Sequence, residues 1–143
     1  MKKKVLCMLL VIGVSSPVLS AEKSLYEKLG GKQAIDAVVV ELTNKMAKDP
    51  LLKKYCANMS KERIEANRAL VANFICKATG GPCEYNGRDM KSAHAGLGIN
   101  EKEWKRFVKL TEETLKQFNV APEVRKEFLS AVATLKEQIV SKK

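Results

Sequence analysis

A single imidazole stands among the residues of this chain that could do chemistry. His94 is the only histidine of the 143 residues, and it lies in the glycine-rich stretch "GGPCEYNGRDMKSAHAGLGI", residues 80–99. One histidine cannot relay a proton to a second one, and it cannot build a cage of several histidines around a metal. A function for His94 therefore has to need one imidazole alone.

Three cysteines are the other candidates for chemistry once an amino-terminal leader is set aside. Together with His94, the residues Cys56, Cys76 and Cys83 make up the inventory of a structural zinc site. No close C-x-x-C pair occurs among them, and thiols of an exported chain tend to pair in an oxidising compartment. We therefore expect a Cys76–Cys83 disulfide and a buried Cys56 thiol rather than zinc. A catalytic Cys-His pair is a weaker alternative, since no orienting partner is identifiable.

The first twenty residues are typical of an export signal. "MKKKVLCMLLVIGVSSPVLS" begins with three lysines after Met1, continues with an apolar run from Val5 to Val14 and ends on small residues. The apolar run is too short to span a bilayer. We expect a signal peptide at residues 1–20 and one domain at residues 21–143. The mature protein is then periplasmic or secreted, without stable membrane insertion.

Removal of the leader leaves a basic chain. Residues 21–143 contain 23 basic and 16 acidic residues, a net charge of +7. The lysines look scattered along polar helix faces, with no arginine-rich run and no interleaved aromatic residues that would stack on bases. We therefore expect a solvated basic surface and no nucleic-acid partner.

The rest of the sequence has the periodicity of helices, and no alternating strand pattern competes with it. A first helix closes at Asp49-Pro50, and a second begins after Ser60 and ends at Gly80-Gly81. A third is capped by Asn100, and a fourth starts at Pro122. The sequence thus predicts a compact all-α fold of four main helices. Their expected buried faces are Ile35, Val38, Val39, Leu42 and Met46; Ile64, Asn67, Val71, Phe74, Ile75 and Ala78; Trp104, Phe107, Val108, Thr111, Leu115 and Phe118; and Val124, Phe128, Val132, Leu135 and Ile139.

The glycine-rich stretch connects the second helix to the third. A connection of that length is unusual in a compact domain and is usually functional. Its glycines leave room only for a short helical turn around Asp89 to Ala95. Met90 and His94 lie four residues apart on that turn, so we expect the thioether and the imidazole to point the same way, toward the core.

Three motifs resemble those of a known family. "SLYEKLGG", "DPLL" and above all residues 80–99 resemble the group I truncated haemoglobins, which are small two-over-two helical globins. The resemblance covers nearly all of residues 24–140, and it implies that His94 is the proximal ligand of a haem iron. A five-coordinate haem needs one neutral imidazole and leaves its opposite side open to a gas. Because no C-x-x-C-H attachment motif is present, we expect noncovalently bound haem b.

The resemblance also implies which residues surround the haem. Aligned on "DPLL", the distal tyrosine of many family members falls at Thr43; aligned backward from "GGP", the distal glutamine falls at Val71, with Leu70 and Asn67 nearby. The aromatic residue that usually packs on the haem falls at Tyr55 or its neighbour Cys56. The polar distal network is therefore weak or rebuilt. The other implied haem neighbours are Phe74, Ile75, Tyr85, Arg88, Met90, Lys91, Leu97, Ile99, Trp104, Phe107 and Val108. We expect at least one of Arg88 and Lys91 to pair with a haem propionate, and solvated surface cations are the alternative.

These expectations describe a haem-binding truncated globin that reversibly binds a diatomic gas, O2 or NO, at the iron opposite His94, and that also takes CO. Two other classes of function stay open. A haem enzyme would convert NO and oxygen to nitrate, or would consume peroxide, and would need an electron-donor protein. A haem-free helical domain would only bind partners. A visible spectrum separates that last class from the others.

Overall fold

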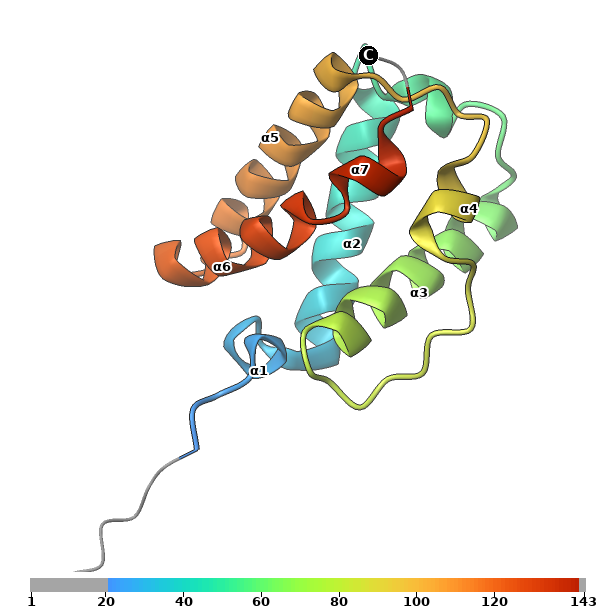
Figure 1. Cartoon of the computed structure of the whole chain (residues 1–143). Coiled ribbons are helices and arrows are strands. Elements are labelled where there is room, and N and C mark those ends of the chain that lie inside the picture. The colour runs from blue at the N-terminus through green and yellow to red at the C-terminus, as the bar shows by residue number, and fades with distance from the viewer. Residues whose placement is uncertain (1–20, 142–143) are drawn as a thin grey trace, which may run out of the picture.

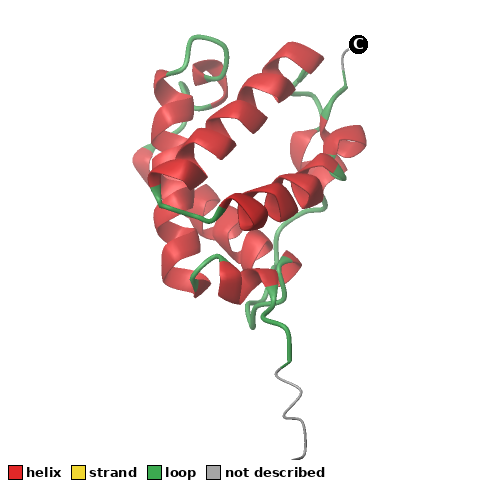
Figure 2. Cartoon of the chain, turned by 90° about the vertical axis from the view of Figure 1, so that its left-hand side faces the viewer, coloured by secondary structure: helices red, strands yellow, loops and turns green. Residues whose placement is uncertain are grey.

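The computed structural model describes residues 21–141, which form helices joined by loops and no strand (Figure 2). The predicted all-α fold is confirmed, whereas the predicted signal peptide lies outside the described residues. No helix within residues 21–141 is long and apolar enough to cross a membrane. The helices are α1 (Leu25–Lys28), α2 (Gly31–Lys48), the short 3-10 helix η1 (Lys53–Tyr55), α3 (Lys61–Ala78), α4 (Met90–His94), α5 (Glu101–Gln117), α6 (Pro122–Ala133) and α7 (Lys136–Ile139).

Four long helices make the body of the fold. Helix α2 packs against both α3 and α5, and α5 packs against α6, so that the long helices form two layers (Figure 1). The short helix α1 contacts α2 and α6 at one end of this body. The four main helices predicted from periodicity are therefore present, and within residues 21–141 the short helices α1, η1, α4 and α7 accompany them.

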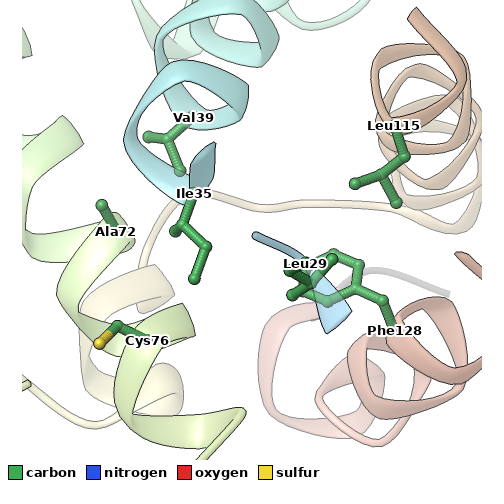
Figure 3. Close-up of a cluster of buried hydrophobic side chains, with 7 residues drawn as sticks. All are labelled: Leu29, Ile35, Val39, Ala72, Cys76, Leu115 and Phe128. Atoms are coloured by element: carbon green, nitrogen blue, oxygen red, sulfur yellow. The ribbon is translucent and has the colours of Figure 1, made fainter. Parts of the chain in front are cut away.

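The main core lies where these helices meet (Figure 3). Helix α2 contributes Ile35 and Val39 at a spacing of four, and α3 contributes Ala72 and Cys76 at the same spacing. Burial of each large apolar side chain stabilises the fold by about 1.5–3 kcal/mol. The full set is Leu29, Ile35, Val39, Ala72, Cys76, Leu115 and Phe128. A second cluster, formed by Leu42, Leu52 and Leu110, extends the core toward η1.

Local hydrogen bonds begin the long helices where the sequence predicts. The Ser60 hydroxyl accepts from the Arg63 N–H at 3.2 Å at the start of α3. Asn100 and Glu103 form a reciprocal capping box at the start of α5, and Pro122 occupies the first turn of α6. A side-chain cap of this kind is worth about 1 kcal/mol.

The prediction of one continuous fourth helix through Ile139 is wrong. Helix α6 ends at Ala133, and after a turn at Thr134 and Leu135 the chain starts α7. In that turn the Leu135 N–H donates to the Val132 carbonyl at 3.0 Å. This bond spans three residues, as in a 3-10 helix, and not four as in an α-helix. No glycine or proline marks the break. Its consequence is that α7 packs against α4, beside the predicted site (Figure 1).

The predicted buried face of α3 is wrong in part: Phe74 and Ile75 are half-buried and Ile75 packs against the main core, but Val71 and Ala78 are not buried. The buried residues are Ala72 and Cys76, whereas Val71 is 47% exposed and Ala78 is exposed as well. Residues that follow one another on a helix are separated by about 100°, so the buried stripe is rotated by roughly a quarter of a turn from the apolar one. The rest of the protein packs against the small side chains Ala72 and Cys76, whereas Leu70 and Val71 remain exposed.

Candidate functional site

Helix α4 is only five residues long, and its first residue and its last are joined by a hydrogen bond. His94 Nδ1 lies 2.8 Å from the Met90 carbonyl oxygen, and the imidazole is half-buried. Because a carbonyl can only accept, Nδ1 carries a proton, and in the neutral imidazole Nε2 then has the free lone pair. An imidazole in this tautomer, held by a backbone carbonyl, is a form in which histidine binds metals.

Asp89 fixes the start of α4. Its carboxylate accepts from the Ser92 N–H at 3.0 Å. Hydrogen bonds from the Ser92 side chain and backbone lower the pKa of Asp89. The short helix is therefore capped by an ionised carboxylate, which also suits the positive end of the helix dipole.

The loop before α4 is tied to α3 at two points. Cys76 and Cys83 form the predicted disulfide, with their Cα atoms 5.8 Å apart. Two residues later, the Tyr85 ring meets the Phe74 ring edge-on, with centroids 5.3 Å apart, and the Tyr85 hydroxyl donates to the Arg88 carbonyl at 2.5 Å. The segment that carries His94 is thus fixed to the helix that carries Val71.

The disulfide also decides against zinc. It uses two of the three thiols that the zinc alternative needs, and residues 21–141 contain no cluster of three metal-binding side chains. Cys56 is the free cysteine, as predicted, but its side chain is half-buried rather than buried. Burial raises the pKa of the Cys56 thiol, and the charge of Arg68 counteracts only part of that rise.

The two cations near α4 lie on the surface. Arg88 Nη1 donates to the Ser92 carbonyl at 3.2 Å, so one edge of its guanidinium holds α4. Lys91 is exposed and forms no ion pair within the described part of the chain. Both side chains remain accessible to an anionic group at the edge of the site.

Thr43, predicted on the distal side, has its hydroxyl hydrogen already in use. Its Oγ1 donates to the Val39 carbonyl one turn earlier in α2, at 2.7 Å. A hydroxyl has one hydrogen, so in this conformation Thr43 can only accept from a further partner. In this conformation the Thr43 hydroxyl therefore does not donate a hydrogen bond to a ligand on the proposed distal side.

The other two distal candidates lie on α3. Asn67 is exposed, and its Nδ2 contacts the Met59 sulfur at 3.3 Å. Val71 is among five large apolar side chains that are exposed in residues 21–141; Leu70 on α3 and Leu97 just after His94 are two more. Amphipathic helices bury such residues, so their exposure marks apolar surface that this chain alone does not cover.

Tyr55, the aromatic residue expected to pack on the haem, is held by a hydrogen bond to Glu103. The Tyr55 hydroxyl donates to Glu103 Oε2 at 2.8 Å, and Lys54 forms an ion pair with Oε1 at 2.5 Å. Glu103 is only 5% exposed, and the hydrogen bond from Lys54 is the main reason why its pKa falls to about 2. These contacts come in addition to the capping box that Glu103 forms with Asn100 at the start of α5. This network uses the Tyr55 hydroxyl and fixes η1 against α5.

The remaining candidates come from α3, α5 and the loop before α5. Trp104 is buried and packs on Phe107 with ring centroids 5.9 Å apart, while Val108 is half-buried. Ile75 packs against the main core and lines an apolar cavity of about 20 Å³. The Ile99 carbonyl accepts from the Ser141 N–H at 3.0 Å, which ties the C-terminal segment to the loop that follows α4.

Comparison with known proteins decides the family. The family model described as "Bacterial-like globin" matches residues 24–141. The chain belongs to this globin family. Among its relatives, a group 1 truncated hemoglobin of Nostoc sp. (strain MUN 8820) is 35% identical over 121 residues, which cover 83% of this chain and 98% of the relative. A group 1 truncated hemoglobin of Chlamydomonas moewusii is 28% identical over 128 residues, 88% of this chain and 73% of the relative.

Solved structures show the same fold for this globin. The truncated hemoglobin of Tetrahymena pyriformis in its Fe(III) form superposes with a TM-score of 0.78 at 25% identity, covering 84% of this chain and all of the other. The 2/2 hemoglobin of Synechococcus sp. PCC 7002, in the cyanomet state and with covalently attached heme, gives 0.72 at 25% identity over 81% and 95% of the two chains. The chain is thus a truncated haemoglobin with the two-over-two helical fold, and membership of the family makes it a haem-binding globin.

The residues of this globin fit a haem. One half-buried imidazole offers a free Nε2, and apolar side chains of α3 and of the segment after His94 are left uncovered by protein. A macrocycle with an apolar face and one iron site matches both features. No hydrogen bond in residues 21–141 joins His94 to Thr43, Asn67 or Val71.

Proposed function

We propose that this globin is exported and reversibly binds O2 or NO at a haem iron, with His94 as the proximal ligand. The hydrogen bond between His94 Nδ1 and the Met90 carbonyl supports the ligand role, because it leaves Nε2 free to bind iron. Bound haem would supply the iron that takes the gas, while the protein holds the imidazole in one orientation.

The proposed distal side is poor in hydrogen-bond donors. Thr43 donates to Val39, Tyr55 donates to Glu103, and Val71 has no polar group to offer. Asn67, which is exposed on α3, is the amide that the family resemblance places near Val71. Bound oxygen carries partial negative charge and gains most from a donor, whereas NO and CO gain little. Fast oxygen release with ordinary NO and CO binding is therefore the behaviour that we propose.

The haem b proposed here is noncovalent. The Synechococcus neighbour is described with covalently attached heme. The present chain has no C-x-x-C-H motif, and its single histidine is assigned to the iron. Acidified butanone should therefore extract the pigment. Haem that stays with the protein would show that a covalent link exists.

The surrounding residues complete the proposed pocket. Arg88 and Lys91, both exposed beside α4, are proposed to pair with the haem propionates. Apolar and aromatic side chains would cover the macrocycle. These proposed contacts are Thr43, Asn67, Val71, Phe74, Ile75, Tyr85, Met90, Ile99, Trp104 and Val108.

Two proposals concern the setting of this globin. The leader-like residues 1–20 support export to the periplasm or beyond. A ferric haem has to be reduced before it binds oxygen, which supports an electron-donor protein as a partner. Stopped-flow mixing of the oxygenated form with NO would separate a gas carrier from an enzyme that forms nitrate.

The test of the function is the His94→Ala variant. Removing the single histidine should abolish stable haem binding or leave a weak adventitious ligand, seen as loss or displacement of the Soret band. Added imidazole should restore a normal band, because it refills the axial position without changing the pocket. If His94→Ala keeps the wild-type Soret band and ligand affinity, the proposed ligand is wrong.

A further inference from the structure

Positive charge gathers in two segments of the described chain. Residues 45–54 and 102–109 contain eight basic and two acidic residues, a net charge of +6. The rest of residues 21–141 contains thirteen basic and fourteen acidic residues, a net charge of −1. The basic residues are thus not spread evenly along the chain, because the net positive charge of residues 21–141 lies in these two segments.

Two ion pairs hold the segments side by side. Arg106 Nε of α5 lies 2.6 Å from Asp49 Oδ2, just after α2, and Lys54 of η1 pairs with Glu103 of α5. Figure 1 shows the C-terminal end of α2 and the N-terminal end of α5 together at one end of the molecule. Both acids are only 5% exposed, and each neutralises one cation, Arg106 or Lys54, so that the other lysines of the two segments keep their charge.

The lysines of α5 form a row. Lys102, Lys105 and Lys109 follow at spacings of three and four, which places them on one face of the helix, and all three are exposed. None of them forms an ion pair with another described residue. Lys48 and Lys53, in the segment that these ion pairs join to α5, are exposed as well. We call the following set the basic face: Lys45, Lys48, Lys53, Lys54, Lys102, Lys105, Arg106 and Lys109.

The chemistry of the basic face favours one kind of partner. A membrane-binding surface adds exposed apolar anchors to its lysines. The large apolar side chains exposed in residues 21–141 are Val40, Leu70, Val71, Leu97 and Phe118, and none of them belongs to either segment. Nucleic-acid grooves combine arginine with stacking aromatics, but the single arginine of this face is occupied by Asp49.

We propose that the basic face binds an acidic surface of a partner protein. Like charges on neighbouring lysines repel one another, and carboxylates of a partner relieve that repulsion while they steer its approach. Such binding weakens as ionic strength rises, because salt screens exposed charges. The inference is independent of haem binding, since it rests only on the charges of the two segments and the ion pairs that join them.

The test compares two triple variants of the full globin. Lys102→Gln, Lys105→Gln and Lys109→Gln together remove the row on α5. Lys61→Gln, Lys77→Gln and Lys126→Gln remove the same charge from exposed sites outside the basic face. Poly-L-glutamate serves as the acidic polypeptide, and its Kd is measured at low and at high salt by calorimetry. Circular dichroism checks that both variants keep the helical fold.

We expect the variant of the basic face to bind poly-L-glutamate at least about tenfold more weakly at low salt, and the control variant to change by less than about twofold. An equal loss in both variants would show that net charge alone governs binding, and it would overturn the proposal. No loss in the α5 variant would do the same. Tighter binding to vesicles of phosphatidylglycerol and phosphatidylcholine, or to a single-stranded DNA 20-mer, would replace the protein partner with a membrane or a nucleic acid.

Discussion

At the scale of single residues, one hydrogen bond determines what His94 can do and another what Thr43 cannot do. The Met90 carbonyl leaves His94 with one free nitrogen. The Val39 carbonyl takes the one hydroxyl hydrogen of Thr43. The proposed proximal side therefore holds its imidazole in one orientation, whereas the proposed distal side offers few donors.

Thr43→Val tests whether the Thr43 hydroxyl serves bound oxygen. Valine keeps the shape of threonine and loses only a hydroxyl that already donates to Val39. We expect the oxygen off-rate of the haem-loaded protein to change by less than about twofold, because no bond to the ligand is lost. A tenfold faster release of oxygen, with an unchanged CO off-rate, would contradict this expectation.

Thr43→Tyr is the matched gain of a donor. A tyrosine hydroxyl that reaches bound oxygen would add a charge-assisted hydrogen bond of roughly 1.5–3 kcal/mol and slow oxygen release by about one to two orders of magnitude. The CO off-rate controls for pocket closure. Unchanged oxygen release with normal CO binding would mean that the distal position lies elsewhere.

At the scale of elements, the loop between α3 and α4 is the part of the fold that positions His94. The disulfide closes it at Cys83, the Tyr85 ring packs on Phe74, and Asp89 caps α4. These contacts replace the regular helix that the glycine-rich stretch cannot form. They also link the helix of the distal candidates to the helix of the proximal one.

Cys83→Ser removes this link to α3. A disulfide between residues seven positions apart lowers the entropy of the unfolded chain and raises its free energy by about 2 kcal/mol. The free energy of unfolding of Cys83→Ser, measured by urea denaturation, should therefore be lower than that of the wild type by about that amount. Cys56→Ser is the control, because Cys56 is the free cysteine. Equal stability of Cys83→Ser and the wild type would mean that the packing of Tyr85 alone holds the loop.

Glu103 joins two elements, η1 and α5, and its ionisation should affect stability in acid. Its pKa in the folded protein is about 2 against an ordinary value of 4.5, chiefly because of the hydrogen bond from Lys54. A lowered folded pKa stabilises the protein above the unfolded pKa, and this stabilisation is lost as pH falls from about 4.5 to about 2. Glu103→Gln should therefore flatten the decrease of unfolding free energy in that pH range and lower stability at pH 7.

The matched control for Glu103 is Glu113→Gln on the same helix. Glu113 is exposed and forms no ion pair within the described residues, so its replacement should leave the acid profile close to that of the wild type. Urea titrations at half-unit pH steps provide the measurement. Identical profiles for both variants would show that the network of Tyr55, Lys54 and Glu103 contributes nothing to stability in acid.

At the scale of the whole molecule, exposed apolar side chains and the net positive charge lie in different segments of the chain. Leu70 and Val71 on α3 and Leu97 after His94 are exposed apolar side chains, whereas the net charge lies in η1, the end of α2 and the start of α5. An apolar surface of this kind favours a ligand that covers it. The charged end favours a partner held by long-range attraction.

Haem removal should therefore destabilise the whole molecule. A ligand that binds only the folded state stabilises it by about 2.7 kcal/mol when its free concentration is 100 times its Kd. We expect the apoprotein to melt at a lower temperature and to bind the dye ANS at the uncovered apolar side chains. His94→Ala should show little stabilisation by added haem. Equal melting temperatures of apoprotein and haem-loaded wild type would contradict the assignment of the pocket.

The candidate site was predictable from the sequence only in its local parts. The position of His94 on a short turn and its likeness to a family motif were readable from residues 80–99, and the structure forms that turn at Met90–His94. The fate of the distal residues was not, because it depends on which hydrogen bonds the folded backbone offers. Thr43 is the example. The sequence places its hydroxyl as a free donor, but in the structure the Val39 carbonyl accepts the hydrogen that a ligand would need.

The sequence by itself determined the helix starts at Ser60, Asn100 and Pro122, because caps and first turns depend on residues within one helical turn. It also determined the Cys76–Cys83 pairing, across a turn of seven residues. Only the tertiary structure decided that α6 breaks before α7, that α3 buries Ala72 rather than Val71, and that ion pairs join residues 45–54 to residues 102–109. These features arise from packing and charge between segments far apart in the chain, which a local pattern does not contain.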